Sequence, residues 1–256
     1  MFFIELIAQI GRYVHFAARS LTAAMLAVRR PRDLLQQLYQ VHVGALPVSL
    51  VGGLALGCII WMHLHDVLIR FGPGNVQLLP QALALAVVLE LAPMGAGLIV
   101  AGRSGASVGA ELGSMRLTEQ IDALEVLGSS PIRTLVGPRV LACMIALPLL
   151  TVKIICLAIA GGFLAELLGG NMAWGEYRNA CLSGLRIEDV VPAVLKTIVF
   201  GYLIGVTGCY CGLMAEGGTE GVGRAATRGV VYSTFLVLIS DVMLVRLIQL
   251  ITAIGS

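Results

Sequence analysis

Residues 43–62, VGALPVSLVGGLALGCIIWM, form an uninterrupted apolar run without a single charged side chain. A helix of about 20 apolar residues is what the hydrocarbon core of a bilayer requires. Four further runs meet this requirement with few charges, and they cover residues 76–101, 140–165, 190–214 and 229–254. The sequence therefore predicts an all-α polytopic membrane protein, with five transmembrane helices in a single membrane domain over residues 1–256.

The composition of the whole chain agrees with this prediction. Hydrophobic residues make up 58% of the sequence and charged residues only 12%, whereas soluble domains carry about 25% charged residues. The 15 arginines and 2 lysines are spread along the chain, and they form no clustered basic face of the kind that binds nucleic acid. We therefore expect contact with a membrane and none with nucleic acid.

The region 1–40 precedes the first span and begins with an amphipathic pattern. Its apolar residues recur at helical spacing and its polar residues fall on the opposite side. The apolar stripe comprises Phe3, Leu6, Ile7, Ile10, Val14, Ala17 and Leu21. This pattern predicts a helix that lies in the membrane interface. An ordinary surface helix docked on the rest of the protein is the alternative.

The distribution of arginine orients the spans. Most arginines fall in the segments 1–42, 102–139 and 215–228, which lie on the same side of a five-span protein. Because basic residues are enriched in cytoplasmic segments, we expect the N-terminus in the cytoplasm and the C-terminus outside. The main outside loop contains Trp174 and Tyr177, which we expect to anchor it at the interface.

Small residues crowd the region that follows the second span. Gly105, Gly109 and Gly113 recur at every fourth position. Because small residues on one helical face let two backbones approach closely, this spacing predicts a tightly packed helix bundle.

Residues 116–128 predict a short amphipathic helix in the long cytoplasmic connection. Thr118 is the expected N-cap, and Glu119 and Asp122 lie in the first turn, where the helix dipole favours negative charge. Gly128 supplies the stop signal. The apolar stripe of this helix comprises Leu117, Ile121 and Leu124. Such a helix either docks into a soluble partner or lies on the membrane surface.

Five charged residues fall within the predicted spans, and they are Glu90, Lys153, Lys196, Asp241 and Arg246. Each costs at least about 2.5–3.5 kcal/mol near the bilayer centre, so it normally faces a partner or a cavity. The expected pairs are Asp241 with Lys196 and Glu90 with Lys153. Such pairs either only lock helices together or border a substrate path.

The run from residue 90 to residue 142 closely resembles the MlaE/YrbE permease family. The blocks that carry the resemblance are ELAP at Glu90–Pro93, AGRSGASVGAELGSM at Ala101–Met115, TEQIDALE at Thr118–Glu125, PIR at Pro131–Arg133 and PR at Pro138–Arg139. A further block, GVGRAATRGVV at Gly221–Val231, leads into the last span. The order and length of these blocks fit the chain from about residue 30 onward.

The resemblance implies the permease subunit of an ABC transporter that moves phospholipid or another hydrophobic lipid between membranes. Such a subunit binds no cofactor, because a separate cytoplasmic ABC ATPase hydrolyses the ATP. It implies a homodimer in the inner membrane of a bacterium, served on the outer side by an MCE-domain lipid-binding protein.

The resemblance also implies roles for particular residues. Glu90, Lys196 and Asp241 occupy positions that the family fills with ionisable residues, and we expect them on the substrate path. The segment expected to couple to the ATPase contains Thr118, Glu119, Gln120, Ile121, Asp122, Leu124 and Glu125. The chain departs from the family at Leu89, where an arginine is expected, and at Lys153, which is outside the family pattern.

Several motifs of catalysis are absent from the sequence. It holds no G-x-x-x-x-G-K-[ST] loop for nucleotide phosphates, no HExxH, no G-x-S-x-G and no clustered Cys/His ligands for a metal. We therefore expect neither an enzyme nor a metal site. The alternative functions are an ion-coupled secondary transporter of hydrophobic substrates, with Glu90 and Asp241 as ion sites, and a membrane scaffold without transport.

Overall fold

The computed structural model describes the backbone of residues 2–170 and 172–255, and the side chains of residues 7–72, 74–170 and 172–250. The described chain is 92% helical and contains no strand. Five helical stretches in it are long and apolar enough to cross a membrane, and they are Pro31–Phe71, Gly74–Leu117, Ile132–Gly169, Ile187–Leu213 and Gly218–Leu250. The predicted all-α polytopic architecture is confirmed.

The helices extend well beyond the apolar runs. The region 1–40 is not one element, because α1 (Phe2–Ala27) ends before a short turn and α2 (Pro31–Phe71) then continues through the first span. Pro31 suits the first turn of α2, since a proline there has no N–H to leave unpaired. The second helical stretch runs on to Leu117, well past residue 101, where the predicted span ends.

Helix α1 docks on the bundle through one face and leaves another face exposed. The Tyr13 hydroxyl lies 2.8 Å from Thr207 Oγ1, and the Tyr202 hydroxyl donates a hydrogen bond to the Ala17 carbonyl at 2.7 Å. Ile10 and Val14, from the predicted apolar stripe, are exposed. The stripe residues Phe3 and Leu6 lie outside the described side chains. Location in the membrane interface stays a prediction.

The second helical stretch changes helix type along its length. It comprises the 3₁₀ turn η1 (Pro73–Leu78), α3 (Leu79–Ala86), the π turn η2 (Val87–Leu91), α4 (Ala92–Val100), a second π turn η3 (Ala101–Gly105) and α5 (Ala106–Leu117). π turns are rare and occur frequently at functional sites. Here the first of them carries Glu90 and the second carries Arg103.

The predicted stripe of small residues does bring helices close together. α5 packs against α9 (Ile187–Leu213) and α10 (Gly218–Gly255). A Cβ added to Gly109 would lie 3.0 Å from the Ala225 carbonyl oxygen, and one added to Gly229 would lie 2.6 Å from the Gly105 carbonyl oxygen. The close approach of these backbones therefore depends on glycine.

The third membrane stretch continues the bundle core. It begins with the π turn η4 (Ile132–Val136) and continues as α7 (Gly137–Gly169), which packs along α2. The helix α8 (Trp174–Ser183) follows α7. Tyr177 on α8 is fully buried and its hydroxyl donates to the Ile159 carbonyl at 3.3 Å. The prediction that Tyr177 anchors the loop at the interface is therefore wrong, whereas Trp174 is exposed.

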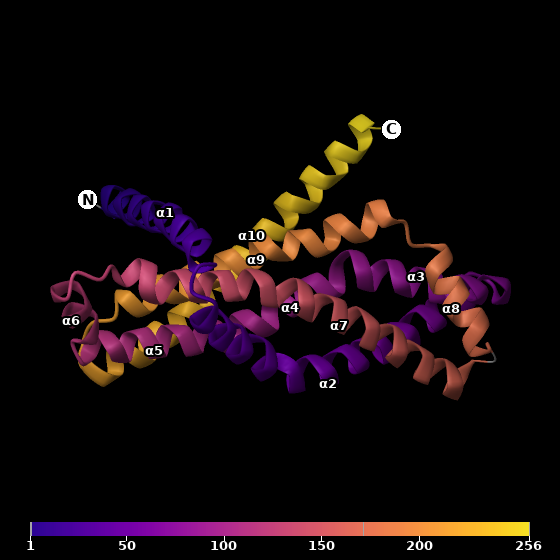
Figure 1. Cartoon of the computed structure of the whole chain (residues 1–256). Helices are drawn as coiled ribbons and strands as arrows, with labels where there is room; N and C mark the ends of the chain where they lie inside the picture. The colour runs from indigo at the N-terminus through magenta and orange to yellow at the C-terminus, as the bar shows by residue number, and fades with distance from the viewer. Residues whose placement is uncertain (1, 171, 256) are drawn as a thin grey trace.

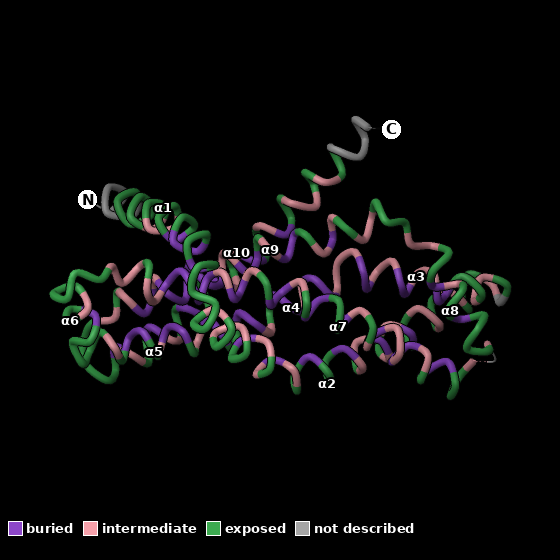
Figure 2. Tube along the Cα trace, in the orientation of Figure 1, coloured by how far each residue is buried: buried purple, intermediate pink, exposed green. Residues whose placement is uncertain are grey.

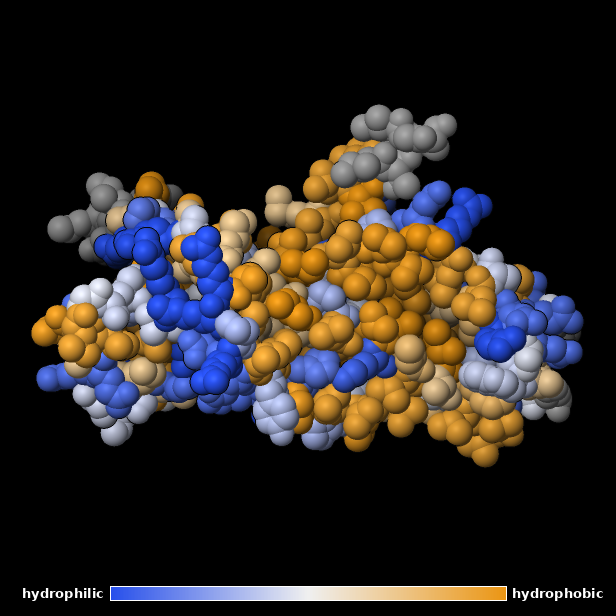
Figure 3. All heavy atoms as spheres, viewed as in Figure 1, coloured by the Kyte–Doolittle hydropathy of each residue, from blue (hydrophilic) through white to orange (hydrophobic). Residues whose placement is uncertain are grey.

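The molecule is an elongated bundle with α8 at one end and the short helix α6 (Gln120–Val126) at the other (Figure 1). Buried residues follow the middle of the bundle, and exposed residues follow most of α1 and the end that carries α6 (Figure 2). On the face shown in Figure 3, a broad apolar surface lies between two regions richer in hydrophilic residues. This pattern is what a membrane-spanning bundle requires.

Candidate functional site

Three ionisable side chains from three separate elements meet inside the bundle. Lys196 Nζ on α9 lies 2.8 Å from Glu90 Oε2 on η2 and 2.9 Å from Asp241 Oδ1 on α10. We call these residues the membrane triad. The predicted pair of Lys196 with Asp241 is present in the structure. The predicted pair of Glu90 with Lys153 is wrong, because Lys153 Nζ lies 2.5 Å from His42 Nε2 instead.

The members of the triad differ in exposure. The Lys196 side chain is 2% exposed and the Asp241 side chain 10%, whereas that of Glu90 is 43% exposed. A buried ammonium needs a carboxylate partner, because removing one member of a buried pair costs about 3–5 kcal/mol. Glu90 is therefore the member of the triad that a neighbouring molecule can contact.

The π turn gives Glu90 its position. Its backbone belongs to Val87–Leu91, which interrupts the α-helical register between α3 and α4. A π turn holds more residues than an α turn, so it changes which side chains face the neighbouring helices. No sequence pattern that we used identifies this π turn, and the approach of Glu90 to Lys196 could not be predicted from spacing along the chain.

The predicted coupling segment forms a helix, but its start differs from the prediction. Thr118 is not the N-cap, since it follows the last residue of α5 and its hydroxyl donates back to the Ser114 carbonyl at 3.0 Å. Glu119, in a left-handed conformation with φ 57°, precedes the first residue of α6. The chain therefore reverses at Glu119, and α6 is shorter than the predicted helix 116–128.

Helix α6 is held to α5 and presents an exposed surface. Arg116, in the last turn of α5, forms a salt bridge with Asp122. Ile121 is buried, whereas Val126 and Leu127 are 88% and 79% exposed. The apolar stripe predicted from the sequence contains Ile121. It does not include Val126 and Leu127, which lie exposed at the end of this short helix.

An additional ion pair, with one buried partner, joins α7 to α5 near the same end of the bundle. Arg139 near the start of α7 places Nη2 2.7 Å from Glu111 Oε1 on α5, and its Nη1 donates to the Leu135 carbonyl at 2.8 Å. The Arg139 side chain is almost fully buried and that of Glu111 is half exposed. Both residues fall within the motif blocks of the sequence, and the structure shows that they contact each other.

A triad of charges around a buried lysine, within five apolar helical stretches, is typical of a membrane transport protein. Comparison with known proteins agrees with this class. The sequence profile of the family described as Permease MlaE matches residues 34–247. The chain therefore belongs to the MlaE permease family.

Individual relatives cover nearly the whole chain. A probable ABC transporter permease protein of Rickettsia typhi is 35% identical over 236 residues, which are 91% of this chain and 90% of that protein. A probable ABC transporter permease protein of Synechocystis sp. is 33% identical over 213 residues, which are 83% and 80% of the two chains. The protein is thus similar over its length to ABC transporter permeases, which implies an ATPase partner.

A relative from a plant has a name that refers to a lipid. The chloroplastic protein TRIGALACTOSYLDIACYLGLYCEROL 1 of Arabidopsis thaliana is 35% identical over 213 residues, which are 83% of this chain and 60% of that protein.

Proposed function

We propose that this protein is the permease subunit of an ABC transporter that moves phospholipid or another hydrophobic lipid between membranes. A separate subunit hydrolyses the ATP. The protein works as a homodimer in the inner membrane of a bacterium, with its N-terminus in the cytoplasm, and an MCE-domain protein exchanges lipid with it on the outer side. The family and the plant relative named for a lipid support this proposal.

The observation that carries the proposal is the membrane triad. Lys196 contacts carboxylates from two other elements, and one of them, Glu90, remains partly exposed. A movement of η2 relative to α9 breaks the pair of Glu90 with Lys196, while the pair of Lys196 with Asp241 persists. We propose that such a movement opens the lipid path, so that the triad couples the state of the path to ATP turnover.

Helix α6 and its flanking residues provide the proposed contact with the ATPase. The acidic residues Glu119, Asp122 and Glu125 are exposed, and the exposed side chains of Val126 and Leu127 lie at the end of the helix. An exposed apolar tip with a charged surround resembles the core and rim of a protein interface.

Neutralisation of the triad tests the proposal. In proteoliposomes that contain the permease with its ATPase, Glu90→Gln, Lys196→Met and Asp241→Asn should each lower ATP-driven lipid transfer at least about tenfold, which corresponds to about 1.4 kcal/mol of lost coupling. Assembly with the ATPase, measured by size-exclusion chromatography, should remain. Wild-type transfer in all three variants would rule out the role of the triad.

The same proteoliposomes separate the proposal from the ion-coupled alternative. Lipid transfer should depend on ATP and should not respond to an imposed proton or sodium gradient. A transfer rate that follows the ion gradient in the absence of ATP would favour a secondary transporter, with Glu90 and Asp241 as its ion sites. His65→Gln, on the distant end of α2, is the matched control for a polar substitution outside the triad.

A further inference from the structure

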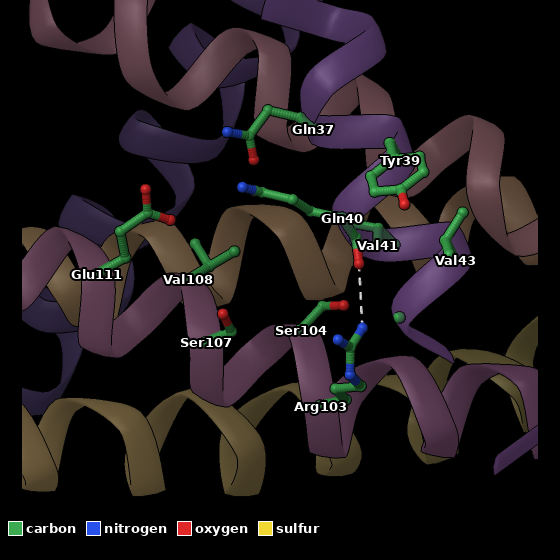
Figure 4. Close-up of a pocket in the computed structure, with 11 residues that line it drawn as sticks. Gln37, Tyr39, Gln40, Val41, Val43, Arg103, Ser104, Ser107, Val108 and Glu111 are labelled. Carbon is green, nitrogen blue, oxygen red and sulfur yellow. Dashed lines mark hydrogen bonds between the residues drawn. The ribbon is translucent and has the colours of Figure 1, made fainter. Parts of the chain in front are cut away.

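A cavity of about 490 Å³ lies between the first turns of α2 and the segment η3–α5 (Figure 4). Its polar lining includes the side chains of Gln37, Gln40, Ser104 and Ser107. The volume falls within the range of small-molecule sites, about 300–1,000 Å³. The membrane triad contributes no residue to this lining, so the cavity is a separate feature of the molecule.

Arg103 provides the positive charge of the cavity. Its Nη1 donates to the Gln40 carbonyl at 3.0 Å, and Figure 4 shows the guanidinium below α2. A Cβ on Gly44 would lie 1.7 Å from the guanidinium, so the glycine leaves the space that Arg103 occupies. A guanidinium carries five N–H donors, and the described residues supply no other hydrogen-bond acceptor or carboxylate to it. Most of these donors are therefore available to a ligand.

The acidic residue in the cavity is already neutralised. Glu111 lines the far side of the cavity, and its carboxylate is paired with the buried guanidinium of Arg139 at 2.7 Å. Arg103, Glu111 and Arg139 together carry a net charge of one positive unit. An anion is therefore favoured next to Arg103, where guanidinium groups bind phosphate oxygens with paired N–H donors.

The surroundings of the cavity are apolar on the side of the membrane centre. Arg103 lies two residues beyond the apolar run 76–101, so a span over that run would put it at the depth of lipid headgroups. On α2, Val48 and Val51 follow Gly44 at four and seven residues, on the same helical face, and both are exposed. Leu98 on α4 is also exposed, more than one turn before Arg103. Acyl chains attached to a headgroup in the cavity would contact these side chains.

We propose that this cavity binds the phosphate group of a glycerophospholipid from the cytoplasmic leaflet, with Arg103 as the main contact. This inference rests on the proposed lipid transport, and it adds a second lipid contact at the cytoplasmic headgroup layer. Ser104, Ser107 and the amides of Gln37 and Gln40 supply hydrogen bonds to the phosphate and glycerol oxygens. The cavity holds the headgroup while the acyl chains remain against α2 and α4.

Photocrosslinking in the assembled complex tests this inference without ATP. The exposed lining residue Tyr39 is replaced by p-benzoylphenylalanine, and the complex is placed in nanodiscs of phosphatidylglycerol that carries a radioactive phosphate. Irradiation should attach radioactivity to the permease chain. Arg103→Gln should lower the attached radioactivity about fivefold or more, because it removes the charge-assisted hydrogen bonds. Arg103→Lys should retain most of it, since the charge remains.

A second variant covers the case in which Arg103→Gln disturbs the fold. Ser107→Asp places a negative charge at an exposed position of the cavity and should lower crosslinking by a similar factor, with the complex intact. Arg29→Gln removes an exposed cation outside the cavity and should leave crosslinking unchanged. Equal crosslinking in the wild type, Arg103→Gln and Ser107→Asp would overturn the inference.

Competition distinguishes a lipid headgroup from a free phosphate. Millimolar inorganic phosphate should leave the crosslinking unchanged, since it lacks the contacts of the acyl chains. Loss of crosslinking under this competition would overturn the assignment to lipid and indicate a site for soluble phosphate. The experiment contains no ATP and measures no transfer. A negative result would therefore contradict only the headgroup site, and the triad variants would still test the proposed transport function.

Discussion

Lys196 contacts carboxylates from two different elements, and this arrangement decides how the intramembrane charges are tolerated. The sequence places two acidic residues and two lysines within the predicted spans. It does not show whether Lys153 or Lys196 is the partner of Glu90. Pairing depends on which helical faces meet, and the π turn at Val87–Leu91 alters the face on which Glu90 lies. Lys153 instead extends to His42 at an exposed position.

Single glycines determine how closely the longest helices approach. Gly57 lies where α2 crosses α7, and a Cβ there would come 1.9 Å from the Ala158 carbonyl oxygen. Gly161 shows the reciprocal arrangement, since a Cβ there would lie 2.2 Å from the Leu54 carbonyl oxygen. Because both obstacles are backbone atoms, neither can move aside without shifting a helix.

Gly57→Ala is therefore expected to destabilise the protein by about 1–3 kcal/mol, the usual effect of overpacking. The measurement is the thermal unfolding midpoint of the purified protein in detergent. Gly223→Ala is the matched control, because a Cβ at Gly223 meets nothing within 4 Å and alanine favours the helix. Equal midpoints for the two variants would contradict the close crossing of α2 and α7.

The capping pattern in the sequence predicts the end of α6 correctly but not its start. The helix and its end at Gly128 follow from the sequence, and Gly128 does adopt a positive φ of 73°. Its start does not follow, because Thr118 completes α5 and the reversal falls on Glu119. A threonine hydroxyl satisfies a preceding carbonyl as readily as a following N–H group, so the residue type alone does not fix the boundary.

The surface of α6 leads to a prediction about the ATPase. Glu119→Lys combined with Asp122→Lys should weaken association with the ATPase at least about tenfold, because reversed charges in an interface cost several kcal/mol. Association is measured by co-purification and by titration of the ATPase. The control is Glu176→Lys with Glu188→Lys, which makes the same change of charge at the opposite end of the molecule. Unchanged association in the α6 variant would count against α6 as the coupling helix.

The interface on α6 should also require its apolar tip. The side chains of Val126 and Leu127 are exposed in the described chain. Large exposed apolar side chains that lie together mark contact sites. They are therefore part of the same proposed surface as the acidic residues. The apolar stripe predicted from the sequence comprises Leu117, Ile121 and Leu124, and of these Ile121 is buried within this chain.

The orientation of the whole chain in the membrane can be tested directly by labelling. In a background without native cysteines, a cysteine at Ser129 should react with a membrane-impermeant maleimide only after the cells are opened. A cysteine at Ser183 should react from outside, once the outer membrane is permeabilised. The expected sides follow from the arginine distribution, since basic segments stay in the cytoplasm. The reverse pattern of labelling would show that the N-terminus lies outside.

Much of the fold follows from the sequence, because a bilayer imposes a simple requirement on length and polarity. Each of the five apolar runs overlaps one of the helical stretches that are long and apolar enough to span a membrane. What does not follow is set by packing between distant segments. Tyr177 looks like an interfacial anchor in the sequence, but it is buried and donates to Ile159. Arg103 looks like one more cytoplasmic cation, but it lies over Gly44 in a cavity.

The π turns affect how the protein responds to the deletion of a single residue. Loss of one codon from a transmembrane α-helix rotates everything beyond it by about 100°, given 3.6 residues per turn. A π turn contains one residue more than an α turn, so we expect the loss of one codon within Val87–Leu91 to restore a regular α turn and to leave α3 and α4 in place. We expect such a deletion to keep the bundle and to change the helical face on which Glu90 lies. The thermal unfolding midpoint should then stay near that of the wild type, while ATP-driven lipid transfer falls.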